Sequence, residues 1–307
     1  MKVSYILPCY NSSRTLPGVV EEIEWKMEKM AGYKFEIILI NDDSSDFTFD
    51  VIQKMCEEKD NVIGINLAKN FGQHSALMAG FQYASGDIVV CMDDDGQTPA
   101  AEVDRLIQKL EEGYDVVYAQ YDRKKHSLLR NMGSYLNMKM AESMLGKPKE
   151  LYLSSYFAAK KYVIEEVKQY KNPYPYVMGL VLRSTNNICN VKVTHRERMK
   201  GKSGYSLKKL VSLWVNGFTS FSVKPLRFAT LSGTVTALVG FVYALWTIIR
   251  KLTEPMVPVG WSSTVAIILM IGGMILFVLG MIGEYIGRIY ICINNSPQYV
   301  IKSEITH

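Results

Sequence analysis

The stretch Val89–Pro99 reads VVCMDDDGQTP and is the most informative part of this chain. An apolar run typical of a buried strand ends in Asp93, Asp94 and Asp95, and Gln97 follows shortly after. Adjacent carboxylates repel one another, and burying them is costly unless a cation lies among them. Oxygen ligands from Asp and Gln suit Mg²⁺ or Mn²⁺, and such an ion would hold a diphosphate. The alternative is a solvated acidic turn that caps the next helix.

Strands and helices are predicted to alternate around this stretch, from Val3 to Ala119. This rhythm predicts an open, largely parallel sheet with helices on both faces. The expected strands are Val3–Leu7, Phe35–Ile40, Val62–Leu67, Ile88–Met92 and Val116–Ala119. The expected helices are Leu16–Met30, Phe47–Glu58, His74–Ala84 and Ala100–Glu112.

Polar clusters follow three of these strands. They are Pro8–Asn11 after the first strand, Asn41–Ser44 after the second and Asp93–Gln97 after the fourth. Ligands of open α/β sheets bind beyond the carboxyl ends of the strands, so the three clusters are expected to form one site. The chain has no Gly-x-Gly-x-x-Gly and no Walker loop, which leaves the phosphates to a metal ion.

Composition excludes several other kinds of site. The chain has 307 residues, is 48% hydrophobic and carries a formal net charge of +5. Its five cysteines and four histidines are scattered, so neither a zinc site nor a histidine-centred triad is expected. The cysteines are interpreted as reduced thiols. No signal peptide precedes the first strand.

The C-terminal third differs in composition from the rest. No charged residue occurs from Phe228 to Ile249, nor between Glu254 and Glu284, and each run is long enough to cross a bilayer as a helix. We predict a transmembrane hairpin here; the alternative is a pair of helices buried in a soluble core. The glycines of the two runs fit close helix packing in lipid: Gly233, Gly240, Gly272, Gly273, Gly280 and Gly283.

Charge around the two runs favours one orientation. Lysines and arginines flank the outer ends of the predicted hairpin, which places both ends in the cytoplasm, whereas Arg250 and Lys251 between the runs argue the other way. Leu207–Phe221 has an apolar face, Trp214 and two lysines, and it is predicted to lie at the membrane surface. Leu128–Leu145 is either a second surface helix or an amphipathic helix packed on the sheet.

Six stretches together resemble glycosyltransferase family 2, and within it the polyprenyl-phosphate glycosyltransferases. They are ILPCYNSSRTL, INDDSSDFT, NFGQHSALMAGFQYASGD, CMDDDGQTP, GKSGYSLKKL and GFTSFSVKPLR, and NSPQYVI near the end is similar to the family's closing segment. The resemblance implies a GT-A fold, Rossmann-like, followed by interfacial helices and the transmembrane hairpin. The implied domains are a cytosolic catalytic domain over residues 1–205, an interfacial helix over 206–227, two membrane helices over 228–285 and a cytosolic tail over 286–307.

The resemblance also implies residue roles. Asp42 matches the aspartate that contacts the nucleotide base, and the nucleotide-sugar set further includes Pro8, Tyr10, Asn11, Asp94 and Asp95. The metal set is Asp93, Asp95 and Gln97, for Mg²⁺ or Mn²⁺. Contacts to the acceptor phosphate are expected from Arg130, Ser134, Arg198, Lys202, Ser203 and Tyr205. Asp93, Asp95, Arg198 and Lys202 form the expected catalytic set.

Some positions depart from the family pattern. The usual Glu after Tyr-Asn is Ser12, and the common Asp-Ala-Asp-Leu-Gln is Asp-Asp-Asp-Gly-Gln. The expected Phe-Arg is Phe157-Ala158, and the acceptor loop reads Ser203-Gly204-Tyr205. The metal set is intact, so activity is expected, while the identity of the sugar and some acceptor contacts are left open.

The implied reaction is an inverting, metal-dependent transfer from a nucleotide sugar, with UDP favoured over GDP, to undecaprenyl phosphate. The partners are the donor, the lipid acceptor and the bilayer, and they do not include nucleic acid. A homo-oligomer and a flippase acting on the product are compatible with the resemblance. The expected location is the cytoplasmic membrane, with the catalytic domain in the cytosol. Two alternatives are a chain-extending membrane glycosyltransferase and a non-catalytic membrane scaffold.

Overall fold

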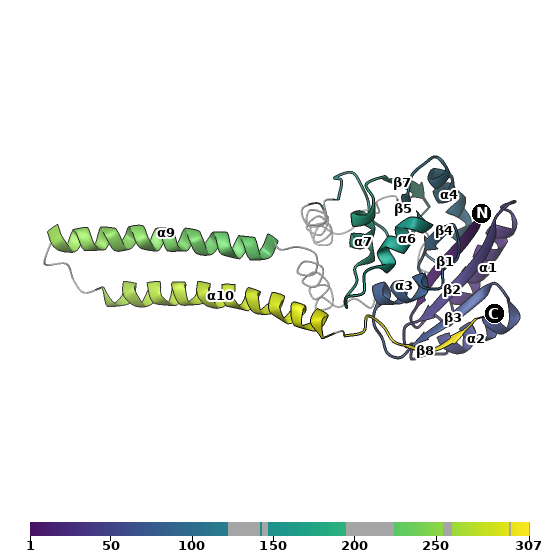
Figure 1. Ribbon diagram of the computed structural model, residues 1–307, viewed down its shortest axis with the longest axis horizontal. Coiled ribbons are helices and arrows are strands. Elements are labelled where there is room, and N and C mark those ends of the chain that lie inside the picture. Colours follow the sequence, from purple (N-terminus) through teal and green to yellow (C-terminus); the bar gives the residue numbers. More distant parts are fainter. Residues whose placement is uncertain (122–141, 143–146, 195–223, 254–259, 295, 307) are drawn as a thin grey trace. The chain divides into compact units, whose positions relative to one another are not determined.

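The computed structural model describes residues 1–121, 142, 147–194, 224–253, 260–294 and 296–306 (Figure 1). The chain forms two units. The first comprises Met1–Leu207 together with Asn295–His307, and the second comprises Lys208–Asn294. The first unit is a sheet between helices, and the second contains two long helices.

A single eight-stranded sheet organises the first unit, in the order β7-β5-β6-β4-β1-β2-β3-β8. Four strand pairs are parallel: β1–β2, β1–β4, β2–β3 and β5–β7. β6 and β8 run antiparallel to their neighbours. The predicted, mostly parallel α/β fold is therefore confirmed. The strands are β1 (Lys2–Cys9), β2 (Lys34–Asn41), β3 (Val62–Leu67), β4 (Ile88–Cys91), β5 (Val116–Tyr121), β6 (Phe157–Lys160), β7 (Ile188–Val193) and β8 (Ile301–Ile305).

Helices cover both faces of this sheet. Side chains of α1, α2 and α4 join the core on one face, and α3 packs against β1 and β2 on the other, where it also contacts α6 and α7. A short 3₁₀ turn, Ala100–Glu102, precedes α4, where the sequence predicts a continuous helix. The helices are α1 (Leu16–Glu28), α2 (Thr48–Glu58), α3 (Gln73–Phe81), α4 (Val103–Glu111), α6 (Lys161–Lys168) and α7 (Val177–Ser184).

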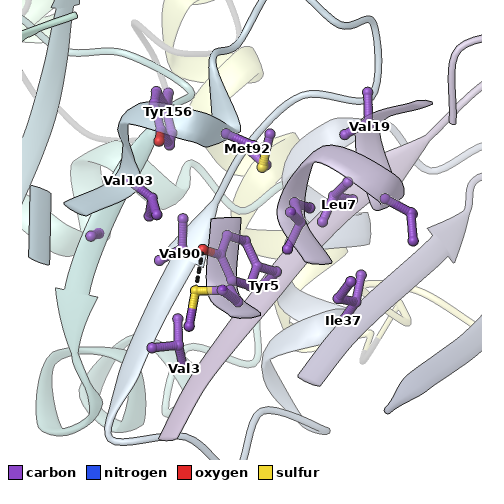
Figure 2. Close-up of a cluster of buried hydrophobic side chains, with 14 of the residues drawn as sticks. Val3, Tyr5, Leu7, Val19, Ile37, Val90, Met92, Val103 and Tyr156 are labelled. Atoms are coloured by element: carbon purple, nitrogen blue, oxygen red, sulfur yellow. Dashed lines mark hydrogen bonds between the residues drawn. The ribbon is translucent and has the colours of Figure 1, made fainter. Parts of the chain in front are cut away.

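The core explains why the central strands are almost continuously apolar. Val3, Tyr5 and Leu7 of β1 are fully buried and lie with Val19 of α1 on one face (Figure 2). The Tyr5 hydroxyl donates to the sulfur of Met27 at 3.1 Å, so this buried polar group is satisfied. Burial raises the pKa of Tyr5 above its usual range. Strands covered on both faces need apolar residues at successive positions, which is the pattern of β1 and β2.

The turn before β4 has no room for a side chain. A Cβ on Gly86 would lie 2.8 Å from the Lys2 carbonyl oxygen and 2.8 Å from the Ser4 nitrogen. We expect Gly86→Ala to destabilise the first unit by about 1–3 kcal/mol, because backbone at the start of β1 must shift. Thermal unfolding followed by circular dichroism measures the change. Gly18→Ala is the matched control, because no atom lies within 4 Å of its added Cβ; equal unfolding midpoints for the two variants would contradict this packing.

The C-terminal segment joins the sheet of the first unit. β8 pairs with β3, and the Ala68 nitrogen donates to the Val300 carbonyl oxygen at 2.8 Å. Gln298 Nε2 donates to the Asn172 carbonyl oxygen at 2.9 Å. The sequence predicts no strand here, because IKSEI has little apolar pattern. In the structure its three central residues are exposed. The chain therefore returns to the first unit after the long helices.

The second unit contains α9 (Lys224–Thr253) and α10 (Trp261–Ile293). Among the described residues, Met270–Ile293 is the only stretch long and apolar enough to cross a membrane, with a mean hydropathy of 1.8. In α9 the apolar part, Ala229–Tyr243, is shorter. α10 continues beyond the predicted end of the second span at 285. Residues 224–227, expected in an interfacial helix, begin α9 instead. The rest of that expected helix lies outside the described residues, as does the expected helix over 128–145 apart from Glu142.

The six glycines of this unit do not lie at a described contact between α9 and α10. The two helices pack against each other, and the Ser232 hydroxyl lies 3.9 Å from the Met274 sulfur. Among the described residues, a Cβ added at any of the six glycines would meet no atom within 4 Å. Close helix packing through these glycines in lipid stays a prediction.

Candidate active site

The register of the sheet brings the three polar clusters together. Cys9 of β1 pairs with Asn41 of β2, and Asn41 pairs with Asn66 of β3. β4 lies on the other side of β1, with Ile6 opposite Cys91. Because these strands are parallel, the residues that follow them emerge at one edge, as the sequence predicts.

Asp42 holds the loop that follows β3. Its carboxylate oxygens accept hydrogen bonds from the backbone nitrogens of Phe71 at 2.7 Å and Gly72 at 2.8 Å. Asn70 Nδ2 donates to the Asp42 carbonyl oxygen at 3.0 Å. Asp42 is only 3% exposed, and burial raises the pKa of its carboxyl despite the two bonds. The described contacts of this carboxylate are thus with the chain's own backbone.

The loop after β1 is tied to the loop after β2. Asn11 adopts a φ of 54°, a left-handed conformation that Asn tolerates, and its side-chain oxygen accepts from the Ser45 nitrogen at 2.9 Å. The Asn11 nitrogen donates to Ser44 Oγ at 3.0 Å. Tyr10 next to it is 54% exposed, which leaves its ring open at the edge of the sheet. Pro8 is the last residue but one of β1, just before this loop.

Asp94 joins the acidic turn to the loop after β1. Its carboxylate accepts from the Tyr10 nitrogen at 3.1 Å, and its carbonyl oxygen accepts from the Thr15 hydroxyl at 2.8 Å. Burial, together with the neighbouring charges of Asp93 and Asp95, raises the pKa of Asp94 to about 6. The ionised form of Asp94 is therefore disfavoured, and a nearby cation would stabilise it.

Asp95 shapes the turn itself. Its Oδ1 accepts from the Gln97 nitrogen at 3.0 Å, and Gly96 between them has a φ of 73° that favours glycine. Gln97 is thereby held next to Asp95. The glycine that departs from the family's Leu is therefore explained by the backbone conformation.

Asp93 receives two hydrogen bonds that the sequence does not predict. Gln73 Nε2 at the start of α3 donates to one oxygen at 2.8 Å, and the Ser155 hydroxyl donates to the other at 2.5 Å. β6 runs antiparallel to β4 with Phe157 opposite Cys91, and the same register brings Ser155 beside Asp93, two residues after the end of β4. The sequence does not indicate that Ser155 belongs to the site, because β6 next to it has only four residues and no distinctive pattern.

The oxygen-rich turn fits a divalent ion in its chemistry. Within the described residues no three Asp, Glu, His or Cys side chains converge as a ready-made metal centre. Asp93, Asp95 and Gln97 instead offer two carboxylates and an amide, which suit Mg²⁺ or Mn²⁺ when phosphate oxygens and water complete the coordination.

The acceptor side of the predicted site lies elsewhere in the sequence. Every expected phosphate contact falls outside the described residues: Arg130, Ser134, Arg198, Lys202, Ser203 and Tyr205. The structure therefore brings the loops that carry the predicted donor and metal residues to one edge of the sheet, and the roles of all three sets stay predictions.

A mostly parallel sheet with three polar loops at one edge is the class of α/β fold that binds its ligand beyond the carboxyl ends of the strands. The profile of glycosyl transferase family 2 matches residues 4–168, and that of the GtrB C-terminal hairpin matches residues 224–289. The chain belongs to glycosyltransferase family 2 and is a glycosyltransferase.

Relatives of this chain match it along nearly its full length. It is 33% identical to the undecaprenyl-phosphate 4-deoxy-4-formamido-L-arabinose transferase of Proteus mirabilis, over 99% of this chain and 94% of the relative. It is 34% identical to the transferase of the same name from Yersinia enterocolitica, with the same coverage.

Solved structures support the fold. Glucosyl-3-phosphoglycerate synthase from Mycobacterium tuberculosis, in complex with Mn²⁺ and UDP-glucose, superposes with a TM-score of 0.55 at 18% identity. The match covers 71% of this chain and 77% of the synthase. Its complex with Mn²⁺, UDP-glucose and phosphoglyceric acid gives a TM-score of 0.53, over 69% and 75% of the two chains. At this identity the likeness establishes the GT-A fold.

Proposed function

We propose that this protein transfers a sugar from a nucleotide-diphosphate sugar to the phosphate of a polyprenyl phosphate at the cytoplasmic face of a membrane. The observation that carries the proposal is the meeting of the Asp42 loop, the Tyr10 loop and the acidic turn at one edge of the sheet. The full-length similarity to undecaprenyl-phosphate aminoarabinose-type transferases supports this class of acceptor. UDP is the proposed nucleotide and undecaprenyl phosphate the proposed lipid.

On the donor side, the Tyr10 ring and the loop that Asp42 holds would line the nucleoside pocket. Asp94 would fix this pocket relative to the acidic turn through its bond to the Tyr10 nitrogen. Asp93, Asp95 and Gln97 would hold Mg²⁺ or Mn²⁺. The ion, when bound, neutralises the departing diphosphate.

On the acceptor side, no general base is needed. A phosphate monoester has a second pKa near 6 and is mostly dianionic at neutral pH. The difficulty is to bring this anion to a sugar whose leaving group is also anionic. Arg198 and Lys202, with Arg130, would guide the phosphate as cations, and Ser134, Ser203 and Tyr205 would hydrogen-bond it. We propose a single in-line displacement with inversion at the anomeric carbon.

The second unit is proposed to anchor the enzyme in the bilayer as a two-span hairpin. Apolar side chains of α10 such as Leu276, 71% exposed, and Met270, 64% exposed, face outward. This exposure favours a membrane helix over the alternative of a helix buried in a soluble core. We place residues 1–205 in the cytosol and assign the hairpin to α9 and α10, after which the chain returns to the cytosolic side and forms β8.

A panel of donors tests the proposal. We expect purified full-length protein in detergent, given undecaprenyl phosphate and Mg²⁺, to move label into the lipid phase from one donor among labelled UDP- and GDP-sugars. EDTA is expected to abolish the transfer. A water-soluble, lengthening saccharide would favour the chain-extending alternative, and the absence of metal-dependent nucleotide binding would favour the scaffold.

A further inference from the structure

The side chain of Asp93 is held from two sides by neutral donors. Gln73 Nε2 lies 2.8 Å from Oδ1, and the Ser155 hydroxyl lies 2.5 Å from Oδ2. The two donors belong to different parts of the fold, the start of α3 and the residues just before β6. With one donor on each oxygen, rotation of the carboxylate breaks at least one bond.

Each donor is itself anchored. Gln73 directly follows Phe71 and Gly72, whose nitrogens are bonded to Asp42. His74, the next residue, packs edge-on against the ring of Tyr176 with centroids 5.1 Å apart.

Ser155 is followed by the fully buried Tyr156, whose hydroxyl donates to the Pro99 carbonyl oxygen at 3.3 Å. Pro99 lies just beyond the acidic turn. The hydrogen bond of Tyr156 therefore connects the segment that carries Ser155 to the end of that turn. The residues next to both donors are thus tied to other parts of the first unit.

The neutrality of the donors matters in this position. Three consecutive carboxylates repel one another, and a lysine or arginine beside them would relieve the repulsion but also cancel the negative charge that attracts a cation. An amide and a hydroxyl fix the orientation of Asp93 and leave its charge available. Groups that orient a metal-binding carboxylate in this way affect metal affinity strongly.

We infer that Gln73 and Ser155 are positioning residues, which orient Asp93 for the divalent ion and couple the acidic turn to the Asp42 loop. The inference rests on the proposed function, because it takes the acidic turn as the metal site. It adds two residues, from outside the turn, on which that site depends.

Direct binding of Mn²⁺ tests this role. The full-length protein in detergent is titrated with Mn²⁺ in the presence of UDP, and free Mn²⁺ is counted by electron paramagnetic resonance. We expect Gln73→Met and Ser155→Ala each to weaken Mn²⁺ binding about tenfold. Ser155→Thr keeps a hydroxyl and is expected to bind close to the wild-type level. Gln82→Ala, an exposed glutamine at the other end of α3, is the matched control and is expected to change nothing.

A double-mutant cycle separates positioning from a general structural role. In an Asp93→Asn background the two substitutions are expected to have little further effect, since both act through that carboxylate. If the variants bind Mn²⁺ as the wild type does, or lose the same factor of Mn²⁺ affinity in the Asp93→Asn background, the inference is overturned and the proposed metal site is not. A wild-type protein that binds no Mn²⁺ with UDP overturns the proposed metal site and the inference with it. Unfolding midpoints of all variants are measured alongside.

Discussion

Replacing Asp95 by alanine is expected to lower the rate of sugar transfer about a hundred- to a thousandfold. The substitution removes a proposed metal ligand and also the acceptor for the Gln97 nitrogen, 3.0 Å away. Loss of charge and loss of turn geometry therefore act together. Steady-state transfer of label to the lipid phase, at saturating donor, measures the effect.

Asp95→Asn separates the two contributions. The amide oxygen can still accept from the Gln97 nitrogen, so the turn is kept while the charge is lost. We expect this variant to be nearly as inactive as Asp95→Ala and to unfold at the wild-type temperature. Transfer at the wild-type rate by either variant would contradict a metal-binding role for the turn.

Replacing Asp42 by alanine is expected to have the largest effect on stability, about 3 kcal/mol, with loss of nucleotide binding. The partly buried backbone nitrogens of Phe71 and Gly72 would lose their acceptors, and water cannot easily replace a side chain that is 3% exposed. For a unit of this size the unfolding midpoint should fall by roughly 10 °C. Thermal unfolding and equilibrium binding of UDP measure the two effects.

Asp43→Asn is the matched control for this prediction. Asp43 is the exposed neighbour of Asp42, with a φ of 55°, a conformation that Asn also tolerates. We expect its unfolding midpoint to be unchanged. An Asp42→Ala variant as stable as Asp43→Asn would show that the loop after β3 does not depend on the buried carboxylate.

The first part of the fold could be predicted from the sequence because its strands are buried on both faces. The predicted strand Val62–Leu67 has the same bounds as β3 in the structure. The predicted bounds of β1 and β2 differ from the observed ones only at the strand ends. β6 and β7 carry no comparable signal. β6 has four residues, and all but one position of β7 is partly exposed, so neither shows a clear period.

The site was predictable to the same extent and for a related reason. Polar residues that directly follow apolar strands are placed by topology alone, which accounts for Tyr10, Asp42 and the acidic turn. Contacts across the sheet depend on register instead. The bonds of Gln73 and Ser155 to Asp93 arise from helix α3 and from the antiparallel β6, and no local pattern encodes either.

The most direct test of the proposed reaction compares two acceptors that differ only in the phosphate. Wild-type protein in detergent receives Mg²⁺, the labelled donor and either undecaprenyl phosphate or undecaprenol. We predict that label enters the lipid phase only with undecaprenyl phosphate, and that mass spectrometry of the product shows one sugar on the phosphate. Equal labelling of undecaprenol, or release of the sugar to water regardless of the lipid, would contradict a transferase that uses a lipid phosphate as its nucleophile.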